Sequence, residues 1–133
     1  MAKVNLEWRG DFDNREVSEL HAEAFGHPVL DAEDWAGQLR SHSLGWVTAR
    51  EGRDLVGFVN VAWDGGVHAF VLDTMVKDAK KRQGSGTQLV KEATKHARAA
   101  GCEWLHVDFE DKLHSFYYSS CGFRATPGGL IQL

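Results

Sequence analysis

The sequence has 133 residues, 43% of them hydrophobic and 26% charged, which is typical of a globular protein, and we expect one domain spanning residues 1–133. The formal net charge of −4 is not the basic balance of a duplex-binding protein, so we expect no nucleic-acid partner. No apolar run approaches the ~20 residues that cross a membrane, and the first residues lack the apolar segment of a secretory signal; we therefore expect a cytoplasmic protein with no membrane partner and two reduced cysteines.

The first part of the chain predicts one strand and two helices. Residues 4–8 alternate apolar and polar side chains, which indicates a strand. Apolar residues at helical spacing predict a helix over residues 14–25 that Gly26 ends. A second helix is expected over residues 31–39, with Asp31 as its N-cap and acids in its first turn.

The middle of the chain predicts three strands in a meander. Strands are expected over residues 45–50 and 54–63, because both runs are rich in apolar residues and the turn at Gly52 separates them. A further tight turn at residues 64–66 leads to a strand over residues 67–76.

The last part of the chain predicts two more helices and two more strands. An amphipathic helix is expected over residues 84–100, followed by a strand over 103–109, a helix over 112–121 and a final strand over 129–133. The order is β-α-α-β-β-β-α-β-α-β. A helix that connects two strands near the end indicates a parallel pair, so the expected class is α/β, with a mixed sheet flanked by helices.

The segment between the strand over 67–76 and the helix over 84–100 is basic and rich in glycine. The first N–H groups of a helix have no internal partners and favour an anion, above all a phosphate. Gly84 and Gly86 allow the backbone to come close to that anion, while Lys80, Lys81 and Arg82 add positive charge. The spacing matches neither a P-loop nor the dinucleotide fingerprint, and a glycine-capped turn with solvated charges remains an alternative.

Two motifs carry a family resemblance. The stretch Lys81-Arg82-Gln83-Gly84-Ser85-Gly86 resembles the pyrophosphate-binding pattern Arg/Gln-x-x-Gly-x-Gly/Ala of the GNAT superfamily, with Lys at the first position. The stretch Tyr118-Ser119-Ser120-Cys121-Gly122-Phe123 resembles the family's Tyr-x-x-x-Gly-Phe. Asp111 and His114 stand where the family often has Asn and Ala, and Asp78 stands where it often has Pro.

The resemblance implies a GNAT-like fold and a function. The implied activity is direct transfer of an acetyl group from acetyl-CoA to a primary amine of a small molecule or peptide, within a ternary complex. Backbone groups near Met75 and Val76 would pair with the pantetheine arm. The residues expected to bind the cosubstrate are Met75, Val76, Lys81, Arg82, Gln83, Gly84, Ser85, Gly86, Thr87 and Asp111.

The resemblance and the residues also suggest catalytic and acceptor-binding groups. Tyr118 matches the family tyrosine that protonates the leaving thiolate, and Tyr117 is expected to pack in the core. Asp73 lies among apolar strand residues, where a carboxylate needs a partner, so it either polarises the acceptor amine or accepts a structural hydrogen bond. Asp108 and Glu110 either receive a cationic substrate or are a solvated strand end, and His27 and Trp35 are expected to wall the acceptor pocket.

Other interpretations remain open. His68 is a second candidate base, and Cys121 could be a nucleophile, although packing is its expected role. A metal could be held by His106, Asp108, Glu110 and His114, but we expect none. The chain could instead be a non-catalytic acyl-CoA sensor, and a homodimer is compatible with the sequence.

Overall fold

The computed structural model describes residues 3–30 and 32–133. The regular elements are β1 (Val4–Trp8), α1 (Asn14–Phe25), α2 (Trp35–His42), β2 (Ser43–Glu51), β3 (Asp54–Trp63), β4 (His68–Val76), α3 (Ser85–Ala99) and β5 (Trp104–His106). Two 3₁₀ turns, η1 (Asp78–Lys80) and η2 (Asp111–Leu113), and a π-helical segment, η3 (Ser115–Ser120), complete them. No helix in these residues is both long and apolar enough to cross a membrane.

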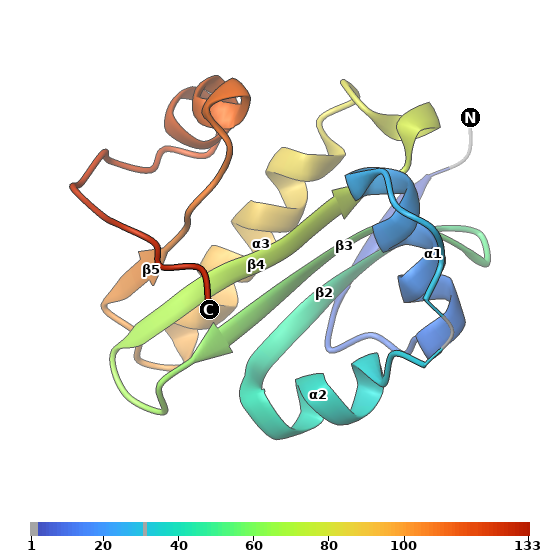
Figure 1. The fold of residues 1–133 in the computed structure, drawn as a ribbon, viewed down its shortest axis with the longest axis horizontal. Helices are drawn as coiled ribbons and strands as arrows, with labels where there is room; N and C mark the ends of the chain where they lie inside the picture. The colour runs from blue at the N-terminus through green and yellow to red at the C-terminus, as the bar shows by residue number, and fades with distance from the viewer. Residues whose placement is uncertain (1–2, 31) are drawn as a thin grey trace.

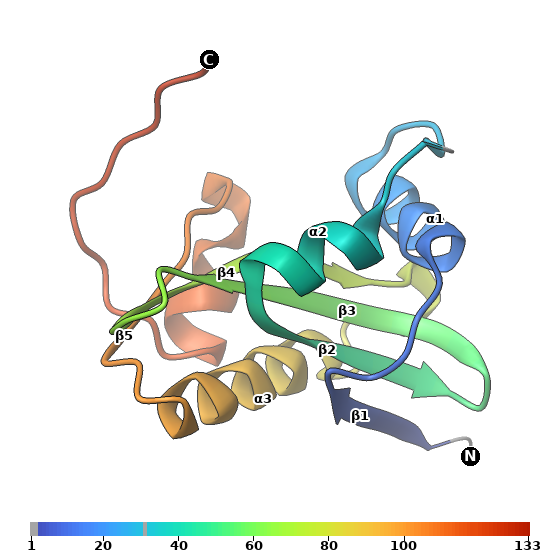
Figure 2. The same ribbon diagram turned by 90° about the horizontal axis from the view of Figure 1, so that it is seen from below.

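The five strands form one mixed sheet in the order β1-β2-β3-β4-β5 (Figure 1). Neighbouring strands are antiparallel from β1 to β4, and β5 is parallel to β4. The expected mixed sheet and its parallel pair, connected by α3, are therefore confirmed. The helices α1 and α2 cover one face of the sheet and α3 covers the other (Figure 2).

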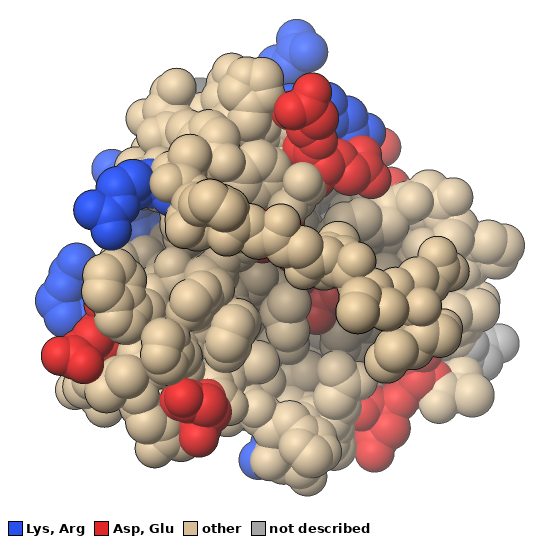
Figure 3. Space-filling view, turned by 60° about the vertical axis from the view of Figure 1, so that its left-hand side comes forward, with Lys and Arg blue, Asp and Glu red and all other residues tan. Residues whose placement is uncertain are grey.

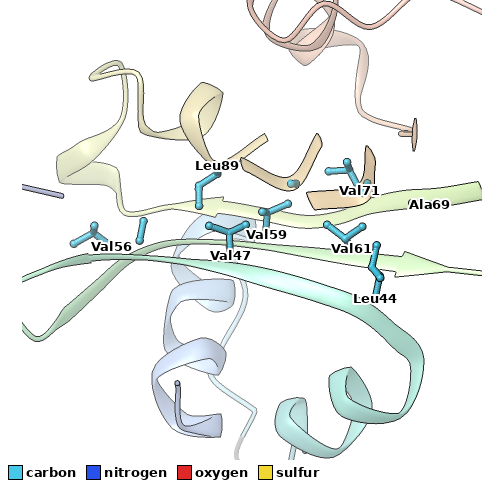
Figure 4. Close-up of a cluster of buried hydrophobic side chains, with 11 residues drawn as sticks. Leu44, Val47, Val56, Val59, Val61, Ala69, Val71 and Leu89 are labelled. Atoms are coloured by element: carbon cyan, nitrogen blue, oxygen red, sulfur yellow. The ribbon is translucent and has the colours of Figure 1, made fainter. Parts of the chain in front are cut away.

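The sheet separates two hydrophobic clusters. Between the sheet and α3, residues such as Val47, Val59 and Leu89 are fully buried against one another (Figure 4). Against α1 and α2, the second cluster is centred on Phe58 and Met75. Packing on both faces explains why β3 is a nearly continuous apolar run rather than an alternating one.

Local capping sets where the first two helices begin. The bounds of α1 are those expected, and Asp13 forms a capping box with Glu16 at its start. The second helix begins at Trp35, later than expected, because Asp34 is its N-cap and accepts a hydrogen bond from the Gly37 N–H at 3.0 Å. The expected cap, Asp31, lies outside the described residues. The helix also continues to His42, beyond the expected end.

The C-terminal part differs most from the sequence-based expectation. The expected strand over 103–109 is reduced to β5, because only Trp104–His106 pair with β4. In place of an α-helix over 112–121, the chain forms η2 and η3, where the Cys121 N–H donates to the Phe116 carbonyl five residues earlier, at 2.9 Å. The expected strand over 129–133 does not form: the segment pairs with no strand of the described residues, and Leu130, Ile131 and Leu133 are exposed.

Candidate functional site

A large cleft opens where β4 separates from β5. The two strands pair only as far as Phe70 and His106, so the edge of β4 from Val71 to Val76 has no strand partner among the described residues. Beyond that point, a cleft of about 1300 Å³ lies between β4 and α1 on one side and the segment from Asp108 to Ser120 on the other. Figure 3 shows this side of the molecule hollowed near its middle, with mostly uncharged side chains around the hollow.

A β-bulge shapes the wall of the cleft. Phe58 of β3 pairs with Met75, and Asn60 pairs with Leu72, so two residues of β4, Asp73 and Thr74, lie opposite a single residue of β3. Asp73 adopts a left-handed backbone with φ of 55°, a conformation rare outside glycine. The bulge brings Asp73 and Thr74 to the cleft side by side, and the Thr74 Oγ1 is buried without a hydrogen-bond partner in residues 3–30 and 32–133.

The Asp73 carboxylate has polar neighbours on two sides. Its Oδ2 accepts a hydrogen bond from the Nδ2 of the buried Asn60 at 3.4 Å, and the Asn60 Oδ1 accepts one from the Ser43 Oγ at 2.5 Å. Its Oδ1 lies 3.6 Å from the Nε2 of His21 on α1. Burial of the Asp73 side chain is incomplete, at 25% exposure, so it can meet a ligand in the cleft.

A second histidine lies behind His21. The His21 Nδ1 is 2.6 Å from the His27 Nε2, and the His27 Nδ1 is 2.7 Å from the Pro28 carbonyl oxygen. Trp35 is buried beside them, and its Nε1 donates to the Ser18 Oγ at 3.1 Å. His27 and Trp35, expected as pocket walls, are therefore one layer behind the lining, which His21 provides.

The glycine-rich loop closes one end of the cleft. Gly84 has φ of 82° and is the N-cap of α3, and no side chain of the described residues caps this helix. Lys81, Arg82, Gly84, Gly86 and Thr87 all line the cleft, as expected for an anion-binding loop. The loop is anchored to α1, because the Asp78 N–H donates to Glu23 Oε2 at 2.7 Å. Its role in binding phosphate stays a prediction.

Two adjacent tyrosines in η3 occupy different environments. Tyr117 lines the cleft and is only 6% exposed, whereas Tyr118 is 40% exposed and is absent from the lining. Burial raises the pKa of the Tyr117 hydroxyl, and the nearby Thr74 hydroxyl offsets part of that rise, although the pair does not reach regular hydrogen-bond geometry. The structure thus places Tyr117, rather than the expected Tyr118, in the lining of the cleft and near Thr74.

The other site residues expected from the sequence differ in whether they line the cleft. Val76, Asp108 and Glu110 line the cleft, whereas the Met75 side chain is buried in the core. Gln83, Ser85 and Asp111 do not belong to the lining.

The alternatives from the sequence lie elsewhere. The His106 Nε2 is 2.8 Å from the His68 Nδ1 at the paired ends of β4 and β5, and neither lines the cleft. In the part of the chain that the structure describes, no group of three or more His, Cys, Asp or Glu residues could hold a metal ion. Burial raises the pKa of the Cys121 thiol, which disfavours the thiolate that a nucleophile needs.

Several lining residues were not assigned to the site from the sequence, among them His21, Phe116 and Tyr117, the last of which was expected to pack in the core. His21 follows the helical periodicity of α1, so its pattern is also that of a core residue. Only the position of α1 beside the bulge of β4 distinguishes it.

Comparisons with known proteins identify the architecture. Residues 14–123 match the family model described as the acetyltransferase (GNAT) family. A GNAT family acetyltransferase from Streptococcus pneumoniae TIGR4 superposes with a TM-score of 0.78 at 24% identity, over 98% of each chain. An acetyltransferase from Trypanosoma brucei gives 0.81 at 18% identity, over 98% of this chain and 99% of that one.

A further solved structure is that of an aminoglycoside acetyltransferase from an uncultured soil metagenomic sample, in complex with sisomicin. It superposes with a TM-score of 0.78 at 15% identity, over 98% of this chain and 94% of that chain. None of the curated proteins matches this chain. At these identities the solved structures establish the fold, and the family match covers most of the chain.

Proposed function

The chain belongs to the GNAT acetyltransferase family, an acyltransferase class of enzyme, and on that premise we propose that it transfers the acetyl group of acetyl-CoA directly to a primary amine. Residues 1–133 would act as one domain. The observation that carries the proposal is the cleft, which runs from the open edge of β4 to the uncapped start of α3. The cysteines Cys102 and Cys121 are both free thiols, which is compatible with a location in the reducing cytoplasm.

The residues present fit a coenzyme A molecule at two points. The start of α3 offers N–H groups that no side chain caps, beside Lys81 and Arg82, and a pyrophosphate needs such a site. The edge of β4 from Val71 to Val76 offers backbone groups without a strand partner, to which an extended amide-bearing arm can pair as an added strand. Bound there, the cosubstrate supplies the thioester that is cleaved.

The acceptor amine would lie on the α1 side of the cleft. Asp73 and His21 present acceptor atoms to it, and Phe25 and Leu72 provide an apolar wall. Asp108 and Glu110 add negative charge across the cleft, which favours a cationic amine. Tyr117 lies near the bulge and keeps its proton at neutral pH because burial raises its pKa, so it can protonate the thiolate.

The test combines binding and turnover. Acetyl-CoA should raise the melting temperature, because a ligand that binds only the folded state stabilises it, and thiol release should appear with at least one member of a panel of primary amines. Binding without thiol release for any amine would favour the acyl-CoA sensor. No thermal shift at millimolar acetyl-CoA would contradict both functions.

A further inference from the structure

A chain of polar contacts runs from a backbone carbonyl to the cleft through two histidines. The Pro28 carbonyl contacts His27, His27 contacts His21, and His21 contacts Asp73, over N···O or N···N separations of 2.7, 2.6 and 3.6 Å. We propose that His21 is the general base that removes a proton from the acceptor amine, that His27 is the positioning residue behind it, and that Asp73 stabilises the imidazolium. The inference rests on the proposed acetyl transfer.

The direction of the contacts determines which nitrogen carries each proton. A carbonyl oxygen only accepts hydrogen bonds, so the His27 Nδ1 must donate to Pro28. A neutral His27 then has a bare Nε2, which accepts a hydrogen bond from the Nδ1–H of His21. The Nε2 of a neutral His21 is therefore a bare lone pair, and it is the nitrogen that faces the cleft beside Asp73.

The gap between His21 and Asp73 suits a cationic donor. A bare Nε2 and a carboxylate oxygen are both acceptors, and their separation of 3.6 Å is too long for a direct hydrogen bond. A primary ammonium has three N–H donors and can bind both acceptors at once. The two side chains are 22% and 25% exposed, so the site is reachable from the cleft while staying largely shielded from water.

The surroundings of His21 support a base rather than a core residue. Among the described residues, His27 from the loop after α1 and Asp73 from β4 are the titratable groups in contact with it. The rings of Phe25 and Trp35, with centroids at 4.5 and 5.3 Å, cover the rest of the imidazole. Imidazole is a much stronger base than a carboxylate, which suits it to removing a proton from an ammonium group.

The proton steps balance. The His21 Nε2 takes one proton from the bound ammonium, which gives the amine nitrogen its lone pair. The amine forms a C–N bond to the thioester carbonyl carbon, the C–S bond breaks, and the second nitrogen proton passes to solvent. The thiolate accepts a proton from Tyr117, which regains one from solvent. The products are the amide, the thiol and one proton, released when the imidazolium of His21 returns to its neutral form.

His21→Gln is the direct test. Turnover at neutral pH should fall about a hundredfold, the usual contribution of a general base, while the Kd for acetyl-CoA stays within about twofold. The acidic limb of the pH–rate profile should disappear in this variant. His27→Gln should lower turnover less, about five- to tenfold, and shift that limb rather than abolish it.

The matched control is His96→Gln. His96 lies on α3, on the opposite face of the sheet, where it stacks on Trp8 and pairs with Glu92. Turnover and its pH profile should be unchanged in this variant. If the wild type transfers acetyl groups and His21→Gln does so equally well across the pH profile, the assignment of His21 is wrong while the proposed function stands.

A second readout needs no turnover. In the free protein with ¹⁵N-labelled histidine, the ring-nitrogen chemical shifts should show neutral His21 with its proton on Nδ1, and His27→Gln should weaken that preference. A proton on Nε2 of neutral His21 would overturn the proposal. A wild type that binds acetyl-CoA but acetylates no amine would overturn the proposed function, and this inference with it.

Discussion

Tyr117→Phe separates the two adjacent tyrosines by function. The ring of Tyr117 stacks on that of Phe109 with centroids 4.6 Å apart, and the variant keeps that packing. Among residues 3–30 and 32–133, the lost hydroxyl makes no regular hydrogen bond to its neighbour Thr74, so the free energy of unfolding should fall by at most about 1 kcal/mol. Turnover should fall about ten- to a hundredfold, which raises the activation barrier by roughly 1.4–2.7 kcal/mol. The loss is smaller than a general acid can contribute, because thiolate is a fairly good leaving group.

The assay is steady-state thiol release with a competent amine, alongside calorimetric titration of acetyl-CoA. The Kd should hardly change in Tyr117→Phe, and Tyr118→Phe is the control, with turnover near that of the wild type. Because burial raises the pKa of Tyr117, its hydroxyl keeps its proton to a higher pH than that of an ordinary tyrosine. The pH–rate profile of the wild type should therefore show no loss of turnover from this group below about pH 10. A large loss in Tyr118→Phe with none in Tyr117→Phe would refute the placement of Tyr117 and restore the prediction from the sequence motif.

Three further outcomes are expected. A Cβ at Gly86 would lie 3.1 Å from the ring of Phe116 in the cleft, so Gly86→Val should weaken acetyl-CoA binding at least tenfold, as measured by calorimetry. Unchanged affinity in a folded variant would show that the loop is not part of the binding site. Cys121→Ser should keep wild-type turnover, since burial raises the pKa of that thiol, and an acetylated wild-type enzyme detected by mass spectrometry would contradict this. Asp13→Ala removes the capping box with Glu16 and should lower the free energy of unfolding by about 1 kcal/mol in urea denaturation, with Asp13→Asn closer to the wild type.

The elements that local sequence specifies were predictable. Val4–Trp8, Asn14–Phe25 and Asp54–Trp63 have the bounds expected from periodicity and glycine, because alternation, helical spacing and turn residues act over a few positions. The glycine-rich loop that lines the cleft was also found in the sequence, since its glycines and basic residues stand in one short consecutive run.

The second helix and the C-terminal part were predicted less well, because competing signals there are resolved by distant contacts. The sequence-based expectation took Asp31 as the N-cap and placed Asp34 in the first turn. In the structure Asp34 is the N-cap, and the Asn14 Oδ1 from α1 also accepts a hydrogen bond from the Ala36 N–H at 2.8 Å. The strand over 103–109 stops early because β5 leaves β4 at His106.

The sequence by itself determined the family, the mixed sheet and the place of the glycine-rich loop, because each of these depends on residues close together in the chain. Only the tertiary structure decided which side chains meet in the cleft. The bulge of β4 turns Asp73 toward His21, 52 positions away in the chain. The π-helical turn of η3 brings Tyr117, not Tyr118, to the lining. Neither the bulge nor the π-helical turn has a local signal in the sequence. The bulge depends on how β4 pairs with β3. A π-helical turn holds about one more residue than an α-helical turn, which changes which of two adjacent side chains faces the cleft.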